Sequence, residues 1–215
     1  MELGDARIVT VSAAYGAGGS VVAPQLAERL GLPFFNRLIP DDRHNSGDAI
    51  RERLTAEERD QAPPGRIVAS LSALSSTLGL PVTGIDDMDP RIDLRRRVET
   101  SVTRIATDGG GVILGRAGAV VLAGTRNAFH VRLYGPAEAC KVQGAEIEAI
   151  SLAEAAQHQA DSDRAWTRFV NRLFDRNPQD ASLYHLLIDS TAIPLTTTIE
   201  LVSQAAHAFW QHSAQ

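Results

Sequence analysis

Residues 7–31 read RIVTVSAAYGAGGSVVAPQLAERLG, and this stretch contains the pattern that decides the fold. It begins with an apolar, β-branched run at residues 8–11, which predicts a short buried strand. A glycine-rich turn follows at residues 15–20. Apolar residues then recur at roughly helical spacing up to Gly31, which predicts a helix that ends there. The expected order is therefore strand, tight turn and helix.

This order directs backbone N–H groups and the positive end of a helix dipole toward one point, where an anion can bind. Glycines suit such a turn because side chains would block the approach and because some positions require positive φ. We therefore interpret the turn as a phosphate-binding loop. Its residues are Tyr15, Gly16, Ala17, Gly18, Gly19 and Ser20. The alternative is a strand-to-helix turn whose glycines serve packing alone.

The turn departs from the Walker pattern G-x-x-x-x-G-K-[ST] because it contains no lysine. Gly19 and Ser20 follow Gly18, so a glycine stands in the position of the Walker lysine. Lys141 is the single lysine of the chain, and no other lysine is available near the turn.

The composition is that of one ordinary soluble domain, with 215 residues, 44% apolar and 22% charged. A net charge of -5 argues against a general binder of nucleic acids or anionic membranes. No segment resembles a signal peptide or a membrane span, and the single cysteine excludes an intrachain disulfide. We therefore expect a cytoplasmic protein.

Short apolar runs alternate with helical patterns along the chain. The expected strands are residues 8–11, 34–36, 112–114, 128–134 and 186–188. The expected helices are residues 20–31, 91–108, 137–175 and 196–212, with three glycines at 109–111 ending the second. Ser151 and Glu154 form a capping-box signature that starts a new helix within residues 137–175. This alternation predicts a three-layer α/β domain with a five-stranded parallel sheet.

Four stretches of the chain carry a resemblance to a known family. They read VTVSAAYGAGGSVVAPQLAERLGLPFFN, GGVILGRAGAVVL, NAFHVRLYGPAEA and LYHLLIDSTAIPL, in the family's order. Together they resemble the cytidylate kinase-like family, a branch of the P-loop nucleoside monophosphate kinases, over about residues 7–202. The loop of that family typically reads S-R-x-Y-G-S-G-G, so a glycine in place of the Walker lysine is a family trait.

The resemblance implies one P-loop kinase domain over residues 1–215. It implies an acceptor-lobe-like helical insertion at residues 37–90, for which a solvated segment is the alternative, and a lid-like helical segment at residues 137–177. It also implies ATP and Mg²⁺ as cofactors. The implied reaction is transfer of the γ-phosphoryl group to a small nucleotide, cytidylate being the family's acceptor.

Gly115-Arg116 directly follows a predicted parallel strand, where open α/β sheets bind their ligands. Arginine grips a phosphate with two parallel hydrogen bonds. The resemblance implies that Arg116 holds the phosphate of the acceptor, because a G-R pair at this place does so in the family. A helix-capping or surface arginine is the alternative.

The run DSDRAWTRF at residues 161–169 resembles the family's lid motif, D-x-x-R-x-x-Y. Two registers are possible, and the flanking sequence VNRLF at residues 170–174 favours the first. A start at Asp163 aligns Phe169 with the aromatic position but places Trp166 where the arginine belongs. A start at Asp161 recovers Arg164 in the arginine position.

A lid arginine matters because charge spreads over the γ-phosphate oxygens during transfer and must be neutralised. If Trp166 takes the arginine position, then Arg164, Arg168 or Arg172 would have to supply that charge from a neighbouring helical turn. We take Arg164 and Arg168, together with Arg116, as the candidate catalytic residues.

Several residues depart from the family pattern, and they remove two or three charges that phosphoryl transfer uses. They are Ala13, Asn36, Cys140 and Trp166. We expect Cys140 to be a buried bystander, because neither a helix start nor a histidine lies beside it in sequence. Two hypotheses follow: a nucleoside monophosphate kinase, or a degenerate homologue that binds a nucleotide or anion without catalysis.

Overall fold

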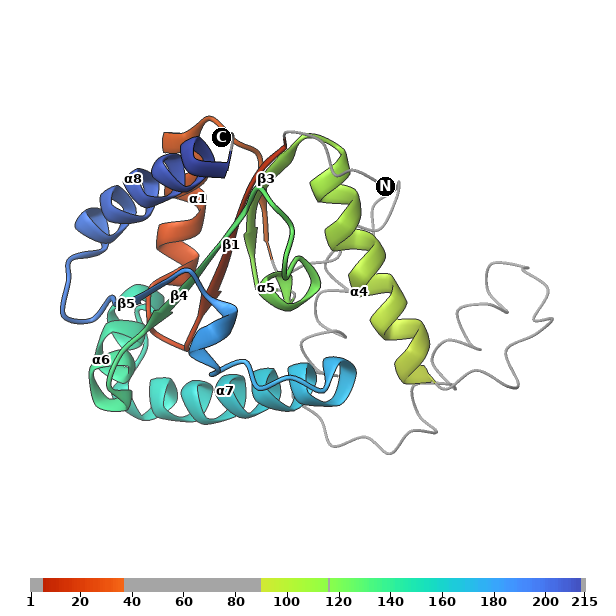
Figure 1. The fold of residues 1–215 in the computed structure, drawn as a ribbon. Coiled ribbons are helices and arrows are strands. Elements are labelled where there is room, and N and C mark those ends of the chain that lie inside the picture. The colour runs from red at the N-terminus through yellow and green to blue at the C-terminus, as the bar shows by residue number, and fades with distance from the viewer. Residues whose placement is uncertain (1–5, 37–89, 116, 214–215) are drawn as a thin grey trace, which may run out of the picture.

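The computed structural model describes residues 6–36, 90–115 and 117–213, which Figure 1 draws as a coloured ribbon. Apart from Pro90, the helical insertion expected at residues 37–90 lies outside the described residues. Arg116 lies outside them as well.

A five-stranded parallel sheet forms the centre of the molecule, with the strand order β2-β3-β1-β4-β5. Its strands are β1 (Arg7–Ala13), β2 (Phe34–Phe35), β3 (Gly110–Leu114), β4 (Ala128–Tyr134) and β5 (Leu186–Asp189). Val9 of the central strand lies opposite Val112 of β3 and Phe129 of β4. The first and third predicted strands are therefore direct neighbours, and the predicted fold class is confirmed.

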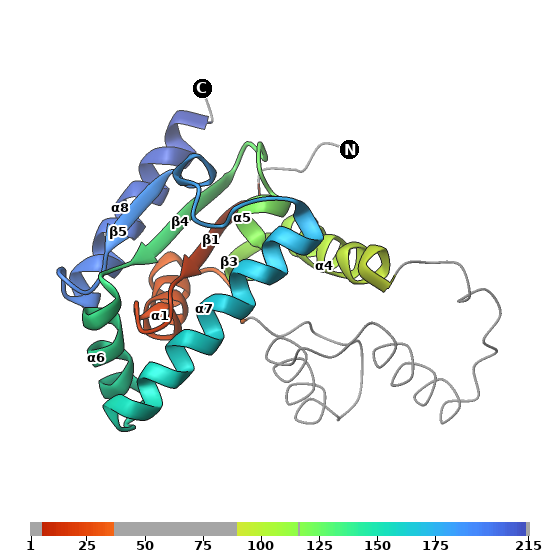
Figure 2. The same ribbon diagram turned by 90° about the horizontal axis from the view of Figure 1, so that it is seen from below.

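Helices cover both faces of this sheet (Figure 1). One group packs on one face and consists of α1 (Gly19–Leu30) and α8 (Leu195–Ser213). The other face is covered by α4 (Pro90–Thr107), α5 (Gly118–Val121) and the end of α7 (Leu152–Phe174). The helix α6 (Ala137–Glu148) leads into α7, and Figure 2 shows both passing the point where β1 ends. None of the described helices is long and apolar enough to cross a membrane.

The core has two layers because successive side chains of a strand point to opposite faces. Val9 and Val11 pack with residues of α1 and α8. Ile8 packs on the opposite face with residues of α4 and α7. All of these valine and isoleucine side chains are buried, which explains why β1 reads as an unbroken apolar run.

The capping box is confirmed at the start of α7. The Ser151 hydroxyl accepts from the Glu154 N–H at 3.2 Å, and the Glu154 carboxylate accepts from the Ser151 N–H at 3.0 Å. The prediction that residues 109–111 end α4 was wrong in part, because Gly110 belongs to β3. A Cβ on Gly110 would lie 2.3 Å from the Arg7 carbonyl oxygen, so glycine there serves the pairing of two strands. The short helix α5 was not predicted, because its four residues are too few to show a helical repeat of apolar residues.

Ala149 ends α6 in the left-handed conformation, with φ 53° and ψ 44°, and its side chain is exposed. An alanine Cβ is disfavoured in that conformation and a glycine is not. We expect Ala149→Gly to raise the free energy of unfolding by roughly 0.5–1 kcal/mol in urea titrations.

Gly31 is the matched control because it ends α1 at φ 64° and ψ 30°, and an added Cβ would meet no atom within 4 Å. Gly31→Ala should therefore lower the free energy of unfolding by a similar amount. A destabilised Ala149→Gly variant would contradict the prediction.

Candidate functional site

The glycine-rich loop lies at the carboxyl end of the central strand β1 and leads directly into α1. Gly16 and Gly18 both adopt left-handed conformations, with φ 69° and 74°. Gly18 is the N-cap of α1, and no side chain caps that helix. The predicted strand, tight turn and helix are therefore present at the centre of the sheet edge where parallel α/β proteins bind ligands.

The loop contains backbone donors that the protein itself leaves unused. Within residues 6–36, 90–115 and 117–213, no acceptor is found for the N–H groups of Gly16, Gly18, Gly19 and Ser20. The N–H of Ala17, by contrast, donates to the Ala14 carbonyl at 3.1 Å. The start of α1 adds the positive end of its dipole to these donors. The loop therefore offers what an anion such as a phosphate requires.

Close packing also requires glycine in this loop. A Cβ on Gly16 would lie 1.8 Å from the carbonyl oxygen of Cys140 in α6. A Cβ on Gly19 would lie 2.5 Å from the Cβ of Ala13. The second contact gives a physical reason for the missing Walker lysine, because any side chain at position 19 would clash with the end of β1.

The helices α6 and α7 bind the loop through Tyr15 and Gly16. The Tyr15 N–H donates to Asp163 Oδ1 at 3.0 Å, and the Tyr15 hydroxyl donates to Glu148 Oε2 at 3.0 Å. Gln143 Nε2 donates to the Gly16 carbonyl at 2.8 Å. Burial, reinforced by the hydrogen bond to Glu148, raises the pKa of Tyr15 to about 12. The phenol therefore stays protonated at neutral pH and remains a donor.

The segment after β5 supports the loop from another side. The buried Ser190 hydroxyl donates to the Ala17 carbonyl at 2.8 Å. Asp189 Oδ1 accepts from the Thr191 hydroxyl at 2.6 Å and from the N–H groups of Thr191 and Ala192. These hydrogen bonds, that from the Thr191 hydroxyl first, lower the pKa of Asp189. Sequence reasoning missed Ser190 and Gln143, although a serine two residues after the strand predicted at 186–188 was a usable signal.

The predicted acceptor-phosphate residue Arg116 lies outside the described residues, so only its flanks are placed. Gly115 directly follows β3, and its N–H donates to the Val11 carbonyl at 2.9 Å, beside the loop. Asn36 directly follows β2 at the same edge of the sheet and is exposed.

Both candidate lid arginines are exposed on α7. Arg164 Nε donates to the Ala160 carbonyl of its own helix at 2.7 Å. Neither Arg164 nor Arg168 contacts the loop in the part of the chain that the structure describes. The structure therefore does not bring these arginines to the loop in this conformation.

The lid register can be judged from the aspartates. Asp163 binds the loop, whereas Asp161 is exposed. This favours the register in which Trp166 replaces the lid arginine and Phe169 takes the aromatic position. Trp166 stacks on Phe169, with ring centroids 5.9 Å apart, and packs on the apolar layer beneath α4.

Cys140 is 1% exposed, as expected for a bystander, but the expectation that no helix starts near it was wrong, because α6 begins at Ala137. Burial, with smaller effects of Asp163 and Asp189, raises its pKa to about 11. The raised pKa and the burial keep the thiol protonated at neutral pH, which does not suit a nucleophile. Lys141, beside it, pairs with Glu138 of the same helix. No group of histidine, cysteine and acidic residues suited to a metal ion is found among the described residues.

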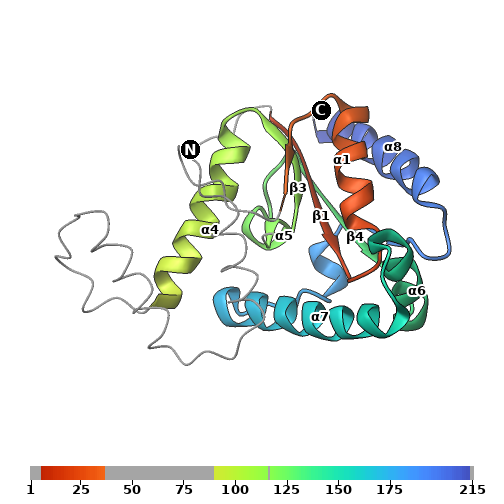
Figure 3. The same ribbon diagram turned by 180° about the vertical axis from the view of Figure 1, so that it is seen from behind.

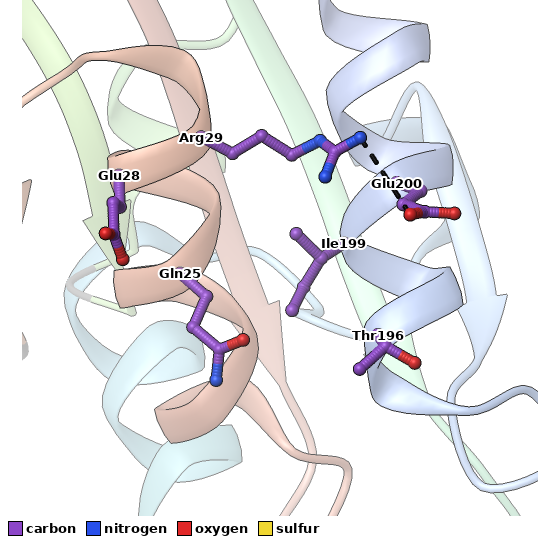
Figure 4. Close-up of a pocket in the computed structure, with 6 residues that line it drawn as sticks. All are labelled: Gln25, Glu28, Arg29, Thr196, Ile199 and Glu200. Atoms are coloured by element: carbon purple, nitrogen blue, oxygen red, sulfur yellow. Dashed lines mark ion pairs between the residues drawn. The ribbon is translucent and has the colours of Figure 1, made fainter.

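A surface groove of about 500 Å³ lies between α1 and α8. Figure 4 shows its lining residues, which are Gln25, Glu28, Arg29, Thr196, Ile199 and Glu200. Arg29 and Glu200 approach to 3.9 Å across it, and both side chains are about half exposed. Such an exposed pair contributes little to stability or binding. The loop is therefore the stronger candidate site.

Comparisons with known proteins identify the family and the fold of the chain. A sequence model described as the cytidylate kinase-like family matches residues 8–192. A solved structure of an uncharacterized protein from Eubacterium ventriosum is 16% identical, with a TM-score of 0.63, and the match covers 94% of this chain and 98% of that one. A gluconokinase from Sinorhizobium meliloti is 18% identical, with a TM-score of 0.50 and coverage of 96% and 94%. At these identities the two structures support the fold alone. No match was found among curated proteins.

Proposed function

Because the chain belongs to the cytidylate kinase-like family and has a P-loop kinase fold, we propose that it transfers the γ-phosphoryl group of ATP to a cytidylate-like nucleoside monophosphate. The observation that carries the proposal is the set of unused N–H donors at Gly16, Gly18, Gly19 and Ser20. They converge where β1 ends and α1 begins, at the centre of the ligand-binding edge of the sheet.

In this proposal the loop amides hold the phosphates of ATP. Mg²⁺, when bound, would neutralise part of the phosphate charge, and the exposed hydroxyl of Ser20 in the first turn of α1 is an oxygen ligand of the kind it prefers. Arg116 would hold the acceptor phosphate. Arg164 or Arg168 would neutralise the migrating group after a rotation of the exposed side chain toward the loop. Catalysis then consists of positioning and charge neutralisation, with no covalent intermediate.

Arg116→Ala tests the acceptor site. We expect kcat/KM for the best of a panel of nucleoside monophosphates to fall by roughly 100-fold or more, because a lost charged donor costs this much in comparable sites. A coupled assay with ATP and Mg²⁺ measures it. Arg126→Ala is the matched control, since Arg126 is exposed just before β4, at the opposite end of the sheet. Turnover that Arg116→Ala leaves unchanged would remove that residue from the site.

A second candidate function is nucleotide or anion binding without catalysis. The packing of Trp166 in the arginine position favours it, as does the bond of Arg164 to its own helix. Calorimetric titration with ATP and CMP in Mg²⁺, run beside the turnover assay, separates the two functions. Binding without turnover supports the second, and combining Trp166→Arg with Asn36→Asp should then restore some activity. Turnover of the unmodified protein at about 1–100 per second would reject it.

A further inference from the structure

We propose that Asp163 holds the lid closed on the phosphate loop, and that its carboxylate competes with a nucleotide phosphate for the loop. The inference rests on the proposed function, because it requires that the loop bind phosphate. It concerns the latch, by which we mean the hydrogen bonds from Tyr15 N–H to Asp163, from the Tyr15 hydroxyl to Glu148, and from Gln143 to the Gly16 carbonyl. Figure 3 shows the helices that supply these partners, α6 and α7, passing the start of α1.

The Asp163 carboxylate occupies a backbone N–H donor that could equally bind a phosphate. Its Oδ1 lies 3.0 Å from the Tyr15 nitrogen, which immediately precedes the unused amides of the loop. A phosphate oxygen would make the same charge-assisted hydrogen bond. The carboxylate also places a negative charge beside those amides, and like charges at short range repel an arriving phosphate. Nucleotide binding must therefore displace Asp163.

The other latch contacts keep Asp163 in place. Tyr15 is 8% exposed, and its hydroxyl binds Glu148 at the end of α6. The same Glu148 oxygen lies 3.0 Å from His158 Nδ1 of α7, whose ring meets the edge of the Tyr15 ring. Gly144 allows the close approach, because a Cβ there would lie 2.7 Å from the Tyr15 ring. Both lid helices thus dock on Tyr15, and α6 also binds Gly16, so the two helices leave the loop or close on it as one unit.

If only molecules with an open latch bind nucleotide, the apparent affinity equals the affinity of the open form multiplied by the fraction of molecules that are open. A hydrogen bond to a charged group shifts such an equilibrium by roughly tenfold or more. Removing the Asp163 carboxylate should therefore tighten nucleotide binding, whereas removing an ordinary structural contact would loosen the site and weaken it.

The test compares Asp163→Ala with Asp161→Ala by calorimetric titration of the full chain with ATP in Mg²⁺. Asp161 is the matched control, because it is an exposed aspartate on the same helix whose removal changes the net charge equally. We expect Asp163→Ala to lower the Kd for ATP by roughly tenfold and Asp161→Ala to change it by about twofold or less. Tyr15→Phe removes the Glu148 contact and should also lower the Kd.

An unchanged or higher Kd in both Asp163→Ala and Tyr15→Phe overturns the inference and leaves the proposed function intact. If neither the unmodified protein nor the variants bind ATP or inorganic pyrophosphate, both the inference and the proposed function are overturned. Amide hydrogen exchange in the ligand-free protein supplies a readout independent of nucleotide. The Tyr15 amide should exchange faster in Asp163→Ala than in Asp161→Ala, and equal protection in the two variants overturns the inference.

Discussion

Gly16→Ala should lower the free energy of unfolding by about 3 kcal/mol or more, the largest effect expected of any single methyl group added to the loop. The added Cβ would lie 1.8 Å from the Cys140 carbonyl oxygen and 2.7 Å from its carbon, and both are backbone atoms that no rotamer change can move. Gly16 also has φ 69°, which disfavours any Cβ. Accommodating the methyl group therefore requires α6 to move away from the loop.

Urea unfolding measures this loss, and Gly31→Ala separates its two causes. Gly31 has a similar φ of 64° but no atom within 4 Å of an added Cβ, so its variant reports the conformational cost alone. A Gly16→Ala variant that loses no more stability than Gly31→Ala would show that α6 does not press on the loop in solution.

Acid should destabilise the protein well above the pH at which its carboxylates titrate, because of His130. This residue of β4 is 3% exposed, and its Nδ1 lies 2.8 Å from the Thr10 hydroxyl. Its ring stacks on that of His185, with centroids 5.0 Å apart. Burial, and secondly the nearby His185, lower the pKa of His130 from 6.5 to about 4. The folded state therefore resists a proton that the unfolded chain accepts.

The direction of the pH dependence of stability follows from proton linkage. Between pH 6.5 and 4 the unfolded state binds more protons at this site than the folded state, so stability falls as the pH falls through that window. The full loss from this one group is roughly 3 kcal/mol. Urea titrations at intervals from pH 7 to pH 4 measure it.

A variant without the titrating ring tests the assignment. His130→Gln should be less stable at pH 7 but should lose less further stability on acidification than the unmodified protein. His212→Gln, at the exposed end of α8, should keep the full pH dependence. Equal slopes for His130→Gln and the unmodified protein would assign the acid sensitivity to other groups.

The fold could be predicted because its signals are local. The strand at Ala128–Tyr134 was expected at its observed bounds, and the capping box at Ser151 marked the start of α7 within a long helical pattern. The glycine turn marked the end of the first strand and the start of the first helix before any strand order was known. The wrong prediction for Gly110 shows the limit of local signals. Glycine is required there by close contact with Arg7, which is distant in sequence.

The contacts of the site could not be predicted, because they join segments far apart in the chain. Tyr15 and Asp163 are separated by 148 positions, and nothing near either residue indicates the other. The flanking sequence favoured the lid register that starts at Asp163, but it did not indicate that the Asp163 side chain binds the loop. The docking of α7 on the loop supplies that contact. The role of Gln143 likewise depends on where α6 lies.

The burial of Cys140 makes its rate of chemical labelling a probe of the contact between α6 and the loop. Cys140 is 1% exposed and lies on α6, the helix whose backbone packs against Gly16. A thiol reagent can reach that sulfur only while α6 is lifted or the chain is unfolded. As the single cysteine of the sequence, it yields one labelling rate without any competing site. Comparing that rate with the rate of global unfolding would reveal whether α6 lifts from the loop in the folded chain, without any need for turnover.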